Sequence, residues 1–214
     1  MLGLGIGLDS SDFVGEAGDS QYVLHTERYS FASSTNNIVK DTSVVGNLTI
    51  TAGQTAPGSS DDDWLKIEFD SNQTSNFSNG VRMVDVFNGN YDFSDGEWVA
   101  LIVDIFLPTG FAGTDVNTPP VRVSMIVDSK QYFYTTSGLS QLSTNVVHED
   151  FGAVNSTNDR YMQVDGASIS EKFAITFNSS GDKPLAGDAF YIRDLRVIVA
   201  SQDLEDDISE ELFS

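Results

Sequence analysis

The chain has 214 residues, no cysteine, and 32 acidic against 11 basic side chains, which gives a formal net charge of −21 at neutral pH. This charge repels nucleic acid and anionic lipid, and the lack of cysteine excludes a disulfide framework and argues against a zinc site. No apolar run approaches the roughly 18 residues that a membrane-spanning helix needs. A chain of this length can bury roughly 70% of its unfolded surface, so it can fold around a hydrophobic core without disulfide bonds or a structural metal ion.

Residues 1–20 are expected to form an arm outside the folded domain. Leu2, Leu4, Ile6 and Leu8 alternate with glycine, which weakens any strand formed within the chain. Such an apolar segment is suited to pairing with another chain, and we predict an assembly arm, with a frayed terminus as the alternative. The segment lacks the basic start and cleavage site of a signal peptide.

From residue 21 the pattern is that of β-strands separated by polar turns. The expected strands are 21–31, 47–51, 64–70, 81–87, 98–107, 121–127, 131–136, about 145–149, 160–165, 172–178 and 190–200. Many short strands and no helix before residue 200 predict an all-β chain, with residues 21–200 forming one antiparallel β-sandwich of the jelly-roll type.

Three of these strands indicate which faces of the sheets are buried. Residues 98–107 are apolar on both faces, which predicts a central strand covered on both sides. Residues 64–70 alternate, which places Leu65, Ile67 and Phe69 inward. The last strand, 190–200, is expected to close the sandwich by returning to the middle of a sheet.

The C-terminal residues 201–214 form an acidic tail. Leu204, Ile208 and Leu212 are spaced four apart, as on one stripe of an amphipathic helix. An isolated helix of about 12 residues is marginal in water, so a short helix and a solvated tail both remain open.

The sequence contains no convincing catalytic constellation. The two histidines lie far apart, and no nucleophile elbow or phosphate-binding glycine loop is present. Residues 68–73, Glu-Phe-Asp-Ser-Asn-Gln, resemble the Glu-x-Asp-x-x-Glu motif of laminarinase-like glycosidases, but Gln73 stands where the second catalytic carboxylate belongs. We therefore predict no catalytic residues and a protein that is not an enzyme.

Asp104 is an unusual acid because it lies within the most apolar strand. A buried carboxylate is costly unless it is paired, and Arg122, Arg193 or Arg196 could supply the partner. We predict an ion pair rather than a ligand site.

Two sets of residues are candidates for binding. Aromatic side chains that could contact a sugar ring are Trp64, Tyr132 and Tyr134, with Trp64 and Tyr134 expected at a rim. Oxygen donors that could hold a structural calcium ion are Asp61, Asp62, Asp63 and Asp194. No other cofactor is expected.

Residues 95–108 and 190–197 resemble jelly-roll carbohydrate-binding modules of the galactose-binding-like type, whose last strand has an aromatic-Tyr-Leu-Asp-Asp-Val pattern. The resemblance implies the fold and binding of a glycan. Asp194 matches the pattern, but Arg193 stands at the aspartate that is often linked to structural calcium.

Residues 1–8 are similar to the starts of tail, fibre and capsid-decorating proteins of tailed bacteriophages. This resemblance implies a virion component made in the host cytoplasm. It would be a homo-oligomer that contacts the major capsid or tail protein, and it could also bind a host-surface glycan.

The leading hypothesis is therefore a non-enzymatic virion structural protein. The alternative is a carbohydrate-binding module that recognises a glycan through aromatic side chains of its loops or sheet. Neither hypothesis includes a nucleic acid or a membrane as a partner.

Overall fold

A computed structural model of the chain describes most of the sandwich. The described residues are 22–41, 44, 46–74, 79–84, 86–87, 89–92, 94–111, 121–127, 130–133, 145–152, 162–163, 171–177 and 184–202. For strand residues 79, 84, 121–127, 130–133, 150–152, 162 and 171–177 only the backbone is described. The arm 1–20 and tail residues 203–214 therefore lie outside the described residues.

Within this part of the chain the elements are β-strands, all paired antiparallel, and no helix occurs. The strands are β1 (Val23–Tyr29), β2 (Ile38–Lys40), β3 (Leu48–Gln54), β4 (Trp64–Phe69), β5 (Asn79–Val84), β6 (Trp98–Phe106), β7 (Val121–Val127), β8 (Lys130–Phe133), β9 (Val147–Gly152), β10 (Met162–Gln163), β11 (Glu171–Phe177) and β12 (Ala189–Ala200). It follows that these residues hold no helix of the kind that crosses a membrane.

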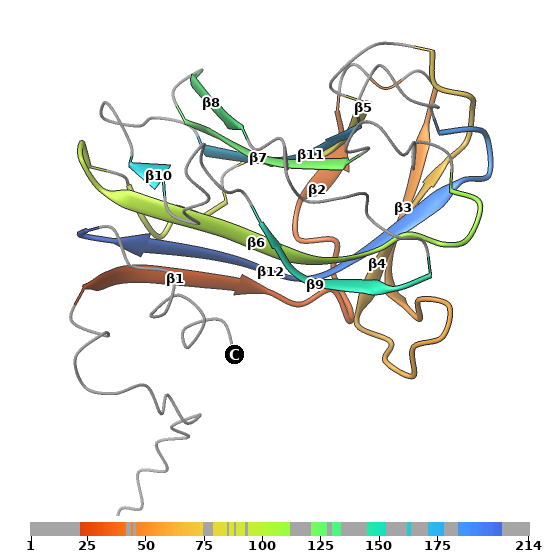
Figure 1. The fold of residues 1–214 in the computed structure, drawn as a ribbon, viewed down its shortest axis with the longest axis horizontal. Coiled ribbons are helices and arrows are strands. Elements are labelled where there is room, and N and C mark those ends of the chain that lie inside the picture. The colour runs from red at the N-terminus through yellow and green to blue at the C-terminus, as the bar shows by residue number, and fades with distance from the viewer. Residues whose placement is uncertain are drawn as a thin grey trace, which may run out of the picture.

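The strands form two sheets that face each other (Figure 1). One has seven strands, in the order β10-β6-β12-β4-β3, with β1 added to β12 and β9 added to β6. The other has five, in the order β2-β5-β11-β7-β8. The architecture is the antiparallel β-sandwich that the strand pattern predicted. Of the described strands, only β2 was missed.

The main core lies between the two sheets, and most of its described side chains belong to the seven-stranded sheet. Leu65, Ile67 and Phe69 of β4 are fully buried, as their alternation predicted. In β6 every residue after Trp98 is buried, because one face packs into the main core and the other is covered as well. The prediction of a central strand covered on both sides is confirmed.

Strand β12 lies in the middle of the seven-stranded sheet and pairs with strands along both of its edges. Along one edge it pairs with β6 over almost its full length. Along the other edge, residues 189–192 pair with β4 and residues 195–200 pair with β1. The expectation that the last strand returns to the middle of a sheet is therefore confirmed, and the new finding is that β4 and β1 follow one another along the same edge.

The change of partner coincides with a β-bulge. Arg193 lies opposite Asp104, and Arg196 lies opposite Ile102, so β12 contains one residue more than β6 between these pairs. Asp194 takes the left-handed conformation at φ 49°, which aspartate tolerates better than most residues. The extra residue lets Ile192 and Leu195 both point into the core while both arginines lie on the opposite face.

The end of β3 lies very close to the backbone after β1. Gly53 has φ 65°, and a Cβ atom there would lie 2.7 Å from the carbonyl oxygen of Ala32. Gly58 has φ 84°, but a Cβ atom there would meet nothing within 4 Å. The two glycines therefore share a left-handed backbone and differ in the space around them.

We predict that Gly53→Ala lowers the free energy of unfolding by about 1–3 kcal/mol more than Gly58→Ala does. Both substitutions carry left-handed strain of about 1–2 kcal/mol, but only the first adds a clash with backbone. Urea denaturation of both variants measures the difference. Equal losses of unfolding free energy in the two variants would contradict the close approach of Gly53 to the Ala32 carbonyl oxygen.

Candidate functional site

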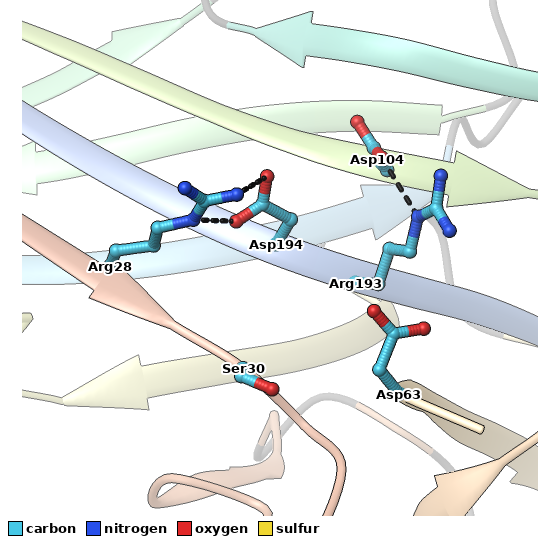
Figure 2. A pocket seen from close by; sticks show the side chains of 6 residues that line it. All are labelled: Arg28, Ser30, Asp63, Asp104, Arg193 and Asp194. Atoms are coloured by element: carbon cyan, nitrogen blue, oxygen red, sulfur yellow. Dashed lines mark hydrogen bonds and ion pairs between the residues drawn. The ribbon is translucent and has the colours of Figure 1, made fainter. Parts of the chain in front are cut away.

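A pocket lies at the bulge of β12, where the neighbouring strand changes from β4 to β1. Strand β1 ends at Tyr29 and β4 begins at Trp64, and the edge of β12 between them carries the bulge. The pocket has a volume of about 390 Å³ and is lined by Arg28, Ser30, Asp63, Asp104, Arg193 and Asp194 (Figure 2). All six lining residues are polar, on a sheet whose other described positions next to the bulge are mostly apolar.

On one side of the pocket, Arg28 holds the bulge residue Asp194. Its Nε and Nη2 atoms donate to the two carboxylate oxygens of Asp194 at 2.5 and 3.0 Å, a bidentate geometry. Arg196 lies on the same carboxylate, with Nε 3.4 Å from Oδ2. The hydrogen bond to Asp194, opposed by desolvation and helped by the charges of Asp194 and Asp104, raises the pKa of Arg28 above its ordinary value.

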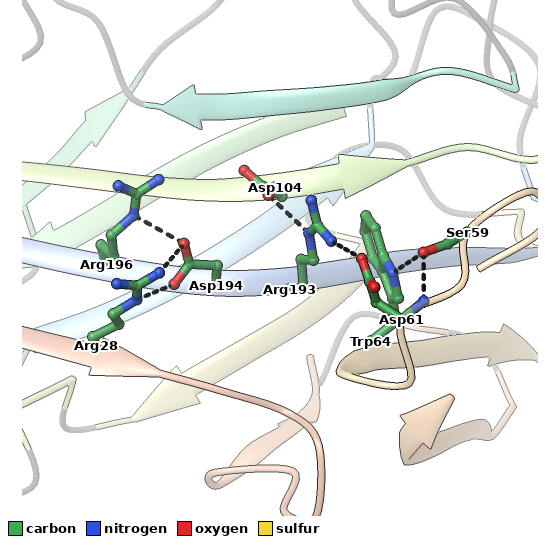
Figure 3. A network of polar contacts seen from close by, with 8 residues as sticks. All are labelled: Arg28, Ser59, Asp61, Trp64, Asp104, Arg193, Asp194 and Arg196. Atoms are coloured by element: carbon green, nitrogen blue, oxygen red, sulfur yellow. Dashed lines mark hydrogen bonds and ion pairs between the residues drawn. The ribbon is translucent and has the colours of Figure 1, made fainter. Parts of the chain in front are cut away.

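On the other side, Arg193 joins three strands (Figure 3). Its Nε donates to Asp104 Oδ2 at 2.9 Å, and its Nη1 donates to Asp61 Oδ2 at 3.0 Å. Its guanidinium carbon lies 4.6 Å from the ring centroid of Trp64, a cation–π contact. Desolvation opposes the charge of Arg193, but the hydrogen bond and the attraction to Asp104, together with Asp63 and Asp61, outweigh it and raise its pKa.

This geometry confirms the predicted ion pair of Asp104. Its side chain is only 8% exposed, and its partner is Arg193, one of the three arginines considered. The side chain of Arg122 lies outside the described residues.

Several hydrogen-bonding groups in the pocket remain unused by the described residues. Arg193 uses Nε and Nη1 but not Nη2, and Arg28 uses Nε and Nη2 but not Nη1. Neither carboxylate oxygen of Asp63 accepts a hydrogen bond from a described residue, and its Oδ1 is buried. Guanidinium N–H donors that ion pairs hold in place thus line the same pocket as the unused carboxylate of Asp63.

The structure overturns the expectation that Trp64 lies at a rim. Its side chain is fully buried, its Nε1 donates to Ser59 Oγ at 3.3 Å, and its ring packs edge-on against Phe106. With Arg193 over the ring and the rest of the indole enclosed, Trp64 offers no face to a sugar. Tyr132 is described in its backbone alone, and Tyr134 lies outside the described residues.

The four aspartates proposed for calcium do not form a metal site. Asp61 is bound to Arg193, Asp194 is bound to Arg28, and the side chain of Asp62 is exposed. The described residues include no group of three side chains arranged to hold a metal ion. Guanidinium groups occupy the places next to Asp61 and Asp194 where a cation would bind, and Asp62 and Asp63 alone supply fewer oxygen ligands than calcium needs.

Arg28 and Ser30 were missed at the sequence level, and Arg193 was considered as a partner of Asp104 and as a departure from a calcium-linked aspartate, but not as part of a binding pocket. Arg28 lies in an expected strand, and nothing local marks it as different from other exposed strand residues. The break in alternation at Asp194, where apolar residues change from even to odd numbers, was the available signal for the bulge.

Comparison with known proteins finds similarity in the fold but not in the sequence. No family model matches the chain, and no curated protein matches its sequence. A solved fragment of Clostridium thermocellum endo-1,4-β-D-xylanase 10B, with CBM22-1 and GH10 modules and bound xylohexaose, superposes with a TM-score of 0.50 at 13% identity over 83% of this chain. The tandem CBM22-1–CBM22-2 domain of Paenibacillus barcinonensis Xyn10C superposes with a TM-score of 0.50 at 10% identity over 86% of this chain.

This chain covers 28% of the first structure and 46% of the second, so each relative is much longer than the shared part. At such low identity the likeness concerns the fold. It supports the expected jelly-roll β-sandwich of a kind found in proteins that contain carbohydrate-binding modules. The comparisons supply no support for a bacteriophage origin or for virion partners.

We predict that Asp104→Ala lowers the free energy of unfolding by about 2–3 kcal/mol. Removing one partner of a buried pair typically has an effect of about 3–5 kcal/mol, and here Arg193 keeps Asp61 as a second partner. The melting temperature should fall by about 5–10 °C. Asp92→Ala, at an exposed position, is the control, and an unchanged melting temperature for Asp104→Ala would contradict the pair.

The assembly role of Leu2, Leu4, Ile6 and Leu8 stays a prediction, because the arm lies outside the described residues. Deletion of residues 1–20 should leave a folded monomer, whereas the full-length protein should be a discrete oligomer. Light scattering on both forms gives the two masses. An unchanged oligomeric mass after deletion would show that the arm is not the assembly device.

Proposed function

We propose that this domain binds a carbohydrate, and that the ligand enters the pocket at the bulge of β12. The observation that carries the proposal is the pairing of unused donors on Arg28 and Arg193 with the unused acceptor Asp63 in one pocket. A pocket of about 390 Å³ falls within the range of small-ligand sites and suits a short part of a glycan.

Hydroxyl groups of sugars match this lining because each can donate one hydrogen bond and accept two. A hydroxyl that accepts from a guanidinium N–H can donate its own proton to a carboxylate or to Ser30 Oγ. Both guanidiniums are already fixed by carboxylates, so little conformational entropy would be lost on binding. The likeness in fold to proteins with carbohydrate-binding modules supports the same function.

Polar contacts rather than ring stacking would have to dominate in this pocket. None of the described aromatic side chains is exposed, and Trp64 is covered by Arg193.

The test is isothermal titration of the full-length protein with a panel of neutral oligosaccharides, beginning with xylohexaose because it was bound in the xylanase 10B structure. We expect binding that Arg193→Lys weakens about tenfold or more, since lysine keeps the charge but loses the planar fork and the stack on Trp64. Lys40→Gln, which changes a cation on the other sheet, should leave affinity unchanged.

Two outcomes would count against the proposal. A protein that binds no member of the panel is not a carbohydrate-binding domain of this kind. Binding that survives Arg193→Lys at full strength, with the melting temperature of the variant unchanged, would place the glycan elsewhere on the molecule.

A further inference from the structure

We infer that the pocket selects uncharged sugars, and that Asp63 is the residue that excludes glycans carrying carboxylates. This inference rests on the proposed function and adds the ligand's charge class and the residue that determines it. Its basis is the charge balance of the lining together with the unsatisfied state of one side chain.

The lining contains three carboxylates but only two guanidiniums. Arg28 is neutralised by Asp194, and Arg193 is neutralised by Asp104. Just outside the lining, Arg193 also binds Asp61 and Arg196 lies against Asp194, and these two additional charges have opposite signs. Asp63 is therefore left as the carboxylate without a hydrogen-bonded cation in this part of the described structure, and the local field repels an anionic ligand despite the two arginines.

The hydrogen-bonding state of Asp63 points to the same ligand class. Neither of its carboxylate oxygens accepts a hydrogen bond from a described residue, and because Oδ1 is closed off from solvent, an incoming O–H group would meet Oδ2. A neutral sugar presents such hydroxyls on every ring. A uronate carboxylate has no proton to give, so it would place one acceptor against another and add like-charge repulsion.

Asp63 is held in place by its neighbour Trp64. The indole of Trp64 is fully buried and donates to Ser59, and the residue pairs with Gln54 of β3. The backbone of the residue directly before such an anchor is fixed in position, which keeps the Asp63 side chain in the pocket lining. Its negative charge would therefore be met by any ligand that reaches Arg193, the residue whose pKa it helps to raise.

The experiment compares neutral oligosaccharides with counterparts of the same linkage and length that carry carboxylates. Suitable pairs are cellohexaose with its C6-oxidised form, a galacto-oligosaccharide with the corresponding galacturonide, and xylohexaose with a glucuronic-acid-substituted xylo-oligosaccharide. Titration uses the full-length protein and the variants Asp63→Asn and Asp62→Asn, in low salt and in 1 M sodium chloride.

For the unsubstituted protein we expect the neutral member of a pair that binds to be preferred about tenfold or more. Asp63→Asn should reduce this preference about five- to tenfold by strengthening binding of the acidic member, because it removes a nearby like charge and keeps the side-chain size. Asp62→Asn, a matched change at the exposed neighbour, should not alter the preference. High salt should narrow the preference of the unsubstituted protein, since ions screen the repulsion.

The outcomes separate this inference from the proposed function. Equal or tighter binding of the acidic members would overturn the inference and leave carbohydrate binding standing. A preference for neutral members that Asp63→Asn does not change would show that Asp63 is not the determinant. Failure of every pair to bind would overturn the proposed function and this inference together.

Discussion

The extra residue in β12 is the constraint on which the site depends. Side chains alternate strictly along a strand, so a strand without the bulge could not keep Ile192 and Leu195 both in the core. Asp194 resolves this conflict by taking the left-handed conformation, and Arg28 binds its carboxylate from the neighbouring strand. The same bulge marks the change of partner from β4 to β1. Core packing, sheet topology and pocket position therefore follow from one local departure from regular pairing.

Hydrophobic periodicity was sufficient to predict the sandwich, because strand faces are determined largely by burial. The alternation in residues 64–70 and the continuous apolar run of residues 98–107 gave the correct faces and the correct central position. Strand β2, only Ile38–Lys40, is too short to show a period and was missed. The buried pair of Asp104 was also predictable, since a carboxylate in an apolar strand requires a cation.

The pocket itself was beyond prediction because it joins residues far apart in the sequence. Arg28 and Asp194 are separated by 166 positions, and their contact depends on β1 pairing with β12 in one particular register. The error about Trp64 has a related cause. Strand propensity places an aromatic residue in a sheet, but only the tertiary structure shows that Arg193 covers its ring.

The position of Arg193 also changes what its departure from the carbohydrate-binding-module pattern means. An arginine in place of a calcium-linked aspartate suggested, from sequence, the loss of a cation site. In the structure the guanidinium is itself the cation that binds Asp104 and Asp61. A charge that belongs to the chain cannot dissociate, and its planar fork leaves one nitrogen directed away from these partners. The ion pairs of Arg193 and its unused donor thus belong to one side chain, and the ion pairs around the bulge also preorganise the groups available to a ligand.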